Sequence, residues 1–252
     1  MEISCVVPTY EHLHLASRAI LSASAQTAVE AEVIVCDDSK TTAVRDFVRS
    51  FGRPGDSLRH FAGPRTGNPV DNWNFGLDQA RAPVRVVLHH DEWFADHAYL
   101  RKALDRLAAS GAPAVVSRTR VGGKSKFGFV SAIARSLGGP RWLLPSINWV
   151  GPTAAFVFSG DHRFDRDFVW LADVEFYLRV SAAGRLAFID GPAVGSTGRH
   201  PGQITASLEM GQAWRRDLAL LESRHGGALS RSAWAFNHAV ATARKALHAR
   251  SP

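Results

Sequence analysis

The sequence predicts an α/β fold in which a mostly parallel sheet carries helices on both faces. Short apolar, β-branched runs alternate with segments of helical period as far as Val121, an order that is typical of such sheets. Polar clusters directly follow three of the apolar runs. Because ligands gather at the carboxyl ends of parallel strands, the same pattern predicts that a functional site lies at this edge.

The apolar runs have the length and the residue types of buried strands. They are rich in Val, Ile, Leu and Phe and carry few charges, as strands buried on both faces do. The expected strands are Ile3–Val7, Val33–Cys36, Leu58–Phe61, Val84–Leu88, Ala114–Arg118, Ala154–Phe158 and Leu186–Ile189.

Between these runs, apolar residues recur every three to four positions, which is the period of an amphipathic helix. In the first such segment, Leu13, Ala16 and Ile20 share one face. Further along, Asp96 can cap a helix that Gly111 ends. Helices are expected at Leu13–Thr27, Thr41–Phe51, Asp71–Ala80, Asp96–Ser110 and Leu171–Ala183, and in the last fifty residues.

The bulk composition narrows the class of protein. A formal net charge of +7 over 252 residues favours anionic partners, and because no nucleic-acid motif accompanies it, no nucleic acid is expected. Cys5 and Cys36 lie inside apolar runs, which predicts buried thiols without a disulfide. The start of the chain does not resemble a signal peptide, and no apolar run approaches the roughly 20 residues that span a bilayer. A cytoplasmic protein is therefore expected.

Two acidic clusters end apolar runs. Asp37 and Asp38 follow the second run, and His89-His90-Asp91-Glu92 follows the fourth. Carboxylate oxygens are hard ligands that suit Mg²⁺ or Mn²⁺. The same residues can also cap helices or face solvent in a turn, so one cluster alone does not decide between these interpretations.

Several segments, taken in order, resemble the family 2 glycosyltransferases, whose GT-A fold is a Rossmann-like nucleotide-diphospho-sugar transferase fold. The resemblance covers roughly residues 2–205. It rests on Val6–Tyr10, Gln26-Thr27, Glu32–Ser39, Asn72–Leu77, Val86–Phe94, Leu171–Arg179 and Arg199–Gln203.

This resemblance implies a metal-assisted, inverting transfer of a sugar from a nucleotide-diphosphate donor to a hydroxyl acceptor on a glycan, a lipid-linked glycan or a small molecule. It implies a catalytic domain over residues 1–205, with a donor half to about residue 95 and an acceptor half from about residue 96. Residues 206–252 would form a helical extension packed on the same domain.

The resemblance also implies roles for particular residues. Asp173 would be the general base, with Glu175 as the second choice. Mn²⁺ or Mg²⁺ would be held by Asp91 and His200. The chain has His90 where the family commonly has another acid, which would either lower the metal affinity or move the selectivity toward Mn²⁺, because imidazole is a softer ligand. Residues expected to contact the nucleotide sugar are Thr9, Glu11, Asp38, Arg65 and His90.

Two segments keep alternative interpretations. Gly122–Val150, which contains Trp142 and Trp149, is either an acceptor-binding loop or a helical insertion with tryptophans in the core. The apolar face that contains Phe236 and Leu247 is flanked by basic residues. It fits a helix that docks on its own domain, on a second subunit of a homodimer, or peripherally on an anionic membrane.

Two other functions remain open. A nucleotidyltransferase that makes sugar nucleotides would use a similar sheet, although Pro8-Thr9-Tyr10 stands where a Gly-rich phosphate loop is expected. A non-catalytic nucleotide-sugar-binding module would bind the donor without turnover.

Overall fold

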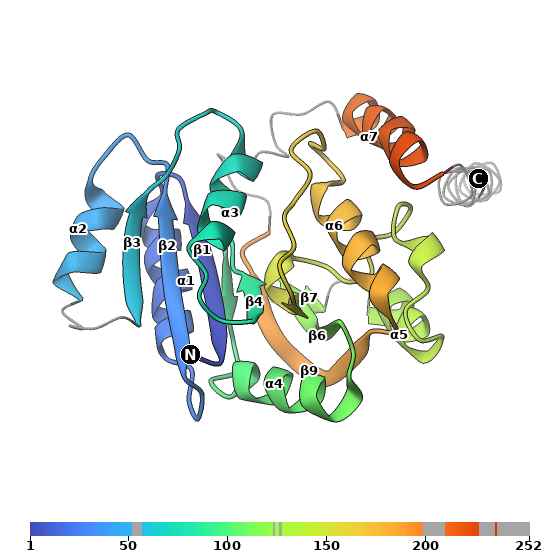
Figure 1. Cartoon of the computed structure of the whole chain (residues 1–252), viewed down its shortest axis with the longest axis horizontal. Coiled ribbons are helices and arrows are strands. Elements are labelled where there is room, and N and C mark those ends of the chain that lie inside the picture. Colours follow the sequence, from blue (N-terminus) through green and yellow to red (C-terminus); the bar gives the residue numbers. More distant parts are fainter. Residues whose placement is uncertain (52–56, 123, 126–127, 199–209, 227–234, 236–252) are drawn as a thin grey trace, which may run out of the picture.

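The computed structural model describes residues 1–51, 57–122, 124–125, 128–198, 210–226 and 235. A single curved sheet runs through the molecule, and helices lie on both of its faces (Figure 1). This arrangement confirms the predicted α/β fold. The predicted basic helix with Phe236 and Leu247, and the predicted metal ligand His200, lie outside the described residues.

The amino-terminal half of the sheet is parallel, as expected. Its strands stand in the order β3-β2-β1-β4, and β1 is buried along its whole length because both faces are covered. The bounds are β1 (Ile3–Thr9), β2 (Ala31–Asp37), β3 (Leu58–Ala62) and β4 (Val84–Val87).

The other half of the sheet is mixed. Beyond β4 the order continues β8-β6-β9-β5, and only the β6–β9 pair is parallel there. The sequence did not predict β5 or β7, which are three and two residues long. The bounds are β5 (Glu92–Phe94), β6 (Ala114–Val121), β7 (Lys124–Ser125), β8 (Phe156–Ser159) and β9 (Ala187–Ser196).

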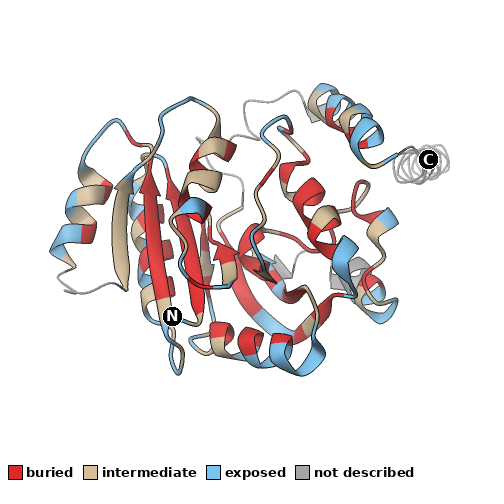
Figure 2. Ribbon diagram, in the orientation of Figure 1, coloured by how far each residue is buried: buried red, intermediate tan, exposed pale blue. Residues whose placement is uncertain are grey.

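The helices form two layers, each with its own apolar core. One core joins α1, α2 and α4 to one face of the sheet, and the other joins α3, α6 and α7 to the opposite face. Figure 2 shows the buried strands between these layers. The bounds are α1 (Leu13–Ser24), α2 (Ala43–Ser50), α3 (Pro69–Asp78), α4 (Tyr99–Ser110), α6 (Ala172–Val180) and α7 (Met210–His225).

The irregular segment Gly122–Val150 contains the helix α5 (Gly128–Ser136) and a 3₁₀ turn, η1 (Arg141–Leu143). Trp149 is 2% exposed and donates a hydrogen bond to the carbonyl oxygen of Pro140, whereas Trp142 is 47% exposed. Trp149 is therefore a core residue, as the helical-insertion interpretation predicts, whereas Trp142 is not. Cys5 and Cys36 are buried free thiols, as predicted. Among the described residues, no helix has both the length and the apolar composition needed to cross a bilayer.

A buried carboxylate ties the start of β1 and β2 to the end of α3. Glu32 is fully buried, and its Oε1 accepts hydrogen bonds from the Ser4 hydroxyl (2.6 Å) and the Arg81 N–H (2.7 Å). Its Oε2 accepts from Arg59, which also donates to the carbonyl oxygen of Gln79. Each oxygen is thus satisfied, which offsets the cost of burying the charge.

We predict that Glu32→Ala lowers the free energy of unfolding by about 3–5 kcal/mol, because Arg59 would keep its charge without the partner that compensates its burial. Glu30→Ala is the matched control: its ion pair with the N-terminus is exposed, and such pairs contribute little. Urea unfolding measures both changes. Equal losses in the two variants would contradict this account of the network.

Candidate active site

The polar clusters meet at the carboxyl edge of the parallel strands. Thr9 at the end of β1 pairs in register with Asp37 at the end of β2, and Asp37 pairs with Ala62 at the end of β3. The N–H of Leu88, just after β4, donates to the carbonyl oxygen of Val6. The loops that follow these strands therefore begin side by side.

Asp37 organises this edge from inside. The carboxylate is buried and accepts hydrogen bonds from the Thr9 hydroxyl (3.1 Å) and the Ser39 N–H (3.0 Å), with His60 Nε2 at 3.4 Å. Burial alone would raise the pKa of Asp37, but the hydrogen bonds from His60, Ser39 and Thr9 outweigh it and lower the pKa below its ordinary value. An ionised carboxylate thus links the ends of β1, β2 and β3.

Glu11 and Asn72 join the loops after β1 and β2. The Glu11 N–H donates to the Ser39 hydroxyl (2.7 Å), and its carboxylate accepts from the N–H of Lys40 (2.9 Å). Glu11 has a φ of +50°, which is uncommon for a residue with a side chain and is often found at functional loops. Asn72 on α3 donates to the carbonyl oxygens of Thr9 and Cys36.

Asp38 lies beside the loop that follows β3. Its Oδ1 accepts a hydrogen bond from the Arg65 N–H (3.0 Å), while the Arg65 guanidinium donates to the Ser39 carbonyl oxygen (3.1 Å). A Cβ at Gly63 would collide with the carboxylate of Asp38, so a side chain there would displace Asp38 from its present position. Asp38 and Arg65 thus stand together.

Beyond β4, three side chains form a group that could hold a metal ion. One ligand atom from each of His89, Asp91 and Glu92 lies within 4.8 Å of the other two. Glu92 begins β5, and its carboxylate accepts hydrogen bonds from the N–H groups of Ala154 (3.1 Å) and His89 (3.3 Å). The carbonyl oxygen of Asp91 accepts from Thr197, just after β9. The sheet therefore fixes this group.

The chemistry of the group suits a divalent cation. Burial lowers the pKa of His89 to about 4, so its imidazole is neutral at neutral pH and has a lone pair to donate. His89 Nε2 is buried and has no hydrogen-bond partner among the described residues. Burial, with the nearby Asp91 charge, raises the pKa of Glu92, and a bound cation would reverse that effect.

Asp173, the second residue of α6, is oriented by a neighbouring amide. Its Oδ2 accepts a hydrogen bond of 2.7 Å from Asn148 Nδ2, and Asn148 also accepts from the Gly151 N–H (2.9 Å). Thr153 and Ala154, which follow Gly151 by two and three residues, contact Glu92. The short segment Asn148–Ala154 therefore contacts both Asp173 and the His89–Asp91–Glu92 group.

Glu175, the second choice for the base, is differently placed. It is 3% exposed and forms an ion pair of 2.9 Å with Arg179. Its Oε1 also lies 3.1 Å from His225 Nε2 on α7. These contacts tie Glu175 to the packing of α6 against α7.

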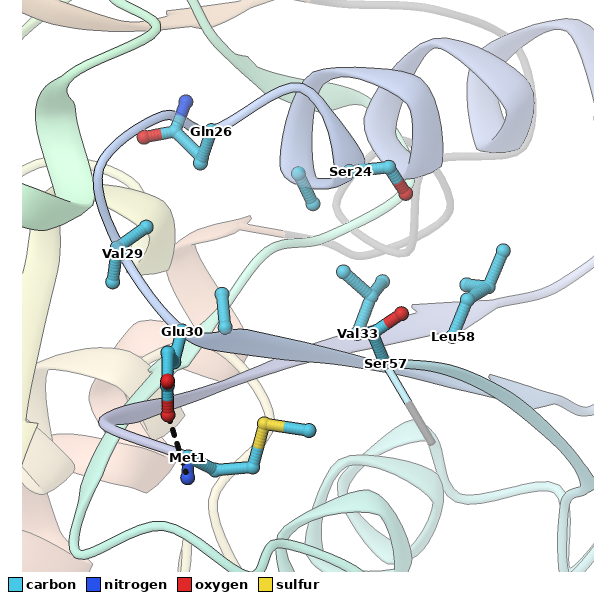
Figure 3. A pocket seen from close by; sticks show the side chains of 10 residues that line it. Met1, Ser24, Gln26, Val29, Glu30, Val33, Ser57 and Leu58 are labelled. Carbon is cyan, nitrogen blue, oxygen red and sulfur yellow. Dashed lines mark ion pairs between the residues drawn. The ribbon is translucent and has the colours of Figure 1, made fainter. Parts of the chain in front are cut away.

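A separate cavity of about 400 Å³ lies at the amino-terminal end of β2, and thus at the opposite end of the parallel strands from the carboxyl edge. Figure 3 shows Met1, Gln26, Glu30 and Leu58 around it. Its lining mixes apolar side chains with polar ones such as Ser24, Gln26 and Glu30, and it contains neither acidic cluster. We therefore assign the functional site to the carboxyl edge.

The predicted site residues thus divide into groups. Glu11, Asp38 and Arg65 lie on neighbouring loops at the carboxyl edge. Thr9 is buried behind them, where its hydroxyl donates to Asp37. Asp91 belongs to the group that could hold a metal ion. The ring of His90 stacks on His12, with 6.2 Å between centroids. Sequence reasoning missed His89 and Glu92 as ligands. The available signal was their position on either side of Asp91 in one acidic cluster.

The sheet is parallel in its amino-terminal half and mixed in the other half, helices cover both faces, and polar clusters lie at the carboxyl edge of the parallel strands. This is the arrangement of the GT-A class of fold. A model of the family described as "Glycosyl transferase family 2" matches residues 4–167. The chain belongs to this family.

Two curated proteins are similar to parts of the chain. The chain is 27% identical over 208 residues to the uncharacterized protein MT1568 of Mycobacterium tuberculosis, covering 74% of this chain and 64% of that one. It is 29% identical over 92 residues to a Campylobacter jejuni GalNAc(5)-diNAcBac-PP-undecaprenol beta-1,3-glucosyltransferase, covering 36% and 30%. The chain thus spans less than two thirds of the length of either relative.

A solved structure shares the fold. The mannosyltransferase PcManGT from Pyrobaculum calidifontis, in complex with GDP-Man and Mn²⁺, superposes with a TM-score of 0.69 at 16% identity. The match covers 96% of this chain and 75% of that one.

We predict that His89→Ala and Asp91→Ala each weaken Mn²⁺ binding at least about tenfold, because removal of a ligand should cost no less than loss of a supporting residue. His90→Ala is the matched control, since its ring stacks on His12 outside the group. Electron paramagnetic resonance of free Mn²⁺ during titration measures the affinities. If the two histidine variants lose equal affinity, the assignment of His89 is wrong.

Proposed function

We propose that this chain transfers a sugar from a nucleotide-diphosphate donor to an acceptor hydroxyl, with inversion at the anomeric carbon. The observation that carries this proposal is the segment Asn148–Ala154, which contacts both Asp173 and the His89–Asp91–Glu92 group. Such a displacement requires a proton acceptor and a cation site held in a fixed geometry, and this segment contacts both.

On the donor side, Asp38 would accept a hydrogen bond from the base, while Glu11, Arg65 and His90 contact the rest of the nucleotide sugar. His89, Asp91 and Glu92 would hold Mn²⁺ or Mg²⁺, which supplies positive charge against the diphosphate. The His200 contribution stays a proposal from the family resemblance.

On the acceptor side, Asp173 would take the proton from the attacking hydroxyl as its oxygen bonds to the anomeric carbon. The bond from that carbon to the diphosphate breaks on the opposite face, and the nucleoside diphosphate leaves. Asn148 holds Asp173 Oδ2, so Asn148 orients the carboxylate toward the acceptor. The acceptor class that we favour is a lipid-linked glycan, by analogy with the Campylobacter relative.

The activity can be tested with a panel of UDP- and GDP-sugars, Mn²⁺ or Mg²⁺, and glycan acceptors. Release of nucleoside diphosphate with formation of a glycoside, and its loss in EDTA, are expected. Pyrophosphate release would instead indicate a nucleotidyltransferase, and donor binding without product would indicate a binding module.

We predict that Asp173→Asn lowers the transfer rate by about 10²–10⁴-fold, the usual contribution of a general base. Donor affinity should stay the same, because the donor contacts come from the loops after β1 to β4. Initial rates and calorimetric donor binding test this.

Glu175→Gln is the matched control, and it should keep transfer even if its unfolding midpoint falls. Wild-type transfer by Asp173→Asn would contradict the assignment of Asp173 as the base. So would a result in which only Glu175→Gln loses transfer.

A further inference from the structure

The helix α7 makes polar contacts with the chain around α6. Leu221 of α7 is 1% exposed and belongs to the same apolar cluster as α6. His225 lies beside Glu175 of α6, and Arg224 pairs with Asp167 at 2.6 Å. Because the two helices pack together, a residue on the inner face of α7 can act on the segment that carries Asp173.

Asp217 is that residue. It is fully buried on α7, and its Oδ2 accepts hydrogen bonds from three successive backbone N–H groups, those of residues 169, 170 and 171, at 2.9, 2.6 and 2.8 Å. Its Oδ1 accepts from the Arg216 guanidinium at 3.1 Å. The carboxylate of α7 therefore holds the backbone turn formed by residues 169–171, which lies before α6.

The turn that Asp217 holds leads directly into α6. Leu171 is the N-cap of α6 and makes no side-chain cap hydrogen bond. Hydrogen bonds from N–H groups to an ionised carboxylate are stronger than neutral ones, and a negative charge at a helix N-terminus is favourable. Asp217 thus holds the backbone turn that ends at this N-cap, two residues before Asp173.

We propose that Asp217 is a positioning residue that fixes the turn before α6 and thereby holds Asp173 in the orientation needed for transfer. This inference rests on the proposed function, because it assumes that Asp173 is the base. It also makes α7 part of the working enzyme, although α7 lies outside the segment that the family model matches.

The full chain carrying Asp217→Ala tests the proposal. We expect kcat to fall about 10²-fold, the cost of a misplacement of about 1 Å, while KM for the donor is unchanged. Asp217→Asn keeps a carbonyl oxygen that can accept from the same turn, so its kcat should lie between those of Asp217→Ala and the wild type. Arg224→Ala is the matched control, because it removes an α7 ion pair without touching the three N–H groups, and it should keep the wild-type kcat.

A double-mutant cycle separates positioning from general stability. If Asp217 acts through Asp173, the Asp217→Ala change should have little further effect on the residual rate of Asp173→Asn. The proposal would be overturned if Asp217→Ala lowered kcat by the same factor in the wild-type and Asp173→Asn backgrounds. A raised KM for the donor with a wild-type kcat would also overturn it. If Asp217→Ala does not fold, the same cycle with Asp217→Asn decides.

The outcomes also distinguish this inference from the proposed function. Wild-type transfer by Asp173→Asn would contradict the proposed base. Loss of transfer by Asp173→Asn together with a wild-type kcat for Asp217→Ala would contradict only the positioning role.

Discussion

The donor edge depends on one buried carboxylate. Asp37 stands where three parallel strands end, and its hydrogen bonds reach Thr9 on β1, Ser39 after β2 and His60 on β3. A buried charge is tolerated only when such partners satisfy it, so its presence fixes the geometry of the loops above it. Glu11, Asp38 and Arg65, three of the side chains that we assign to the donor, lie on those loops.

The acceptor side is built on the same principle. Asp217 is a second buried carboxylate, and its partners are backbone N–H groups of a turn rather than side chains on strands. Between the two halves, the segment Asn148–Ala154 links Asp173 to Glu92. The proposed chemistry therefore lies where the parallel half of the sheet, the mixed half of the sheet and α7 meet.

The sequence revealed most of the parallel half, because buried strands read as apolar runs and helices keep their period. It failed where structure depends on distant pairing: β5 is three residues long and exists because Glu92–Phe94 pairs with β9. Asp91 was found from the acidic cluster, but His89 was not, although it lies in the same cluster three residues before Glu92, because the sequence does not show which side chains of a cluster face one another. Asp217 could not be predicted, since its partners lie 46 to 48 residues earlier in the chain.

The central claim is that the carboxyl edge binds a nucleoside diphosphate together with a divalent cation. A crystal grown with a nucleoside diphosphate and Mn²⁺, and measured at the manganese absorption edge, tests it most directly. We expect one anomalous peak within bonding distance of His89, Asp91 and Glu92, with the diphosphate beside it and the base near Asp38. A nucleotide in the cavity at the amino end of β2, or Mn²⁺ bound away from these three residues, would contradict the account.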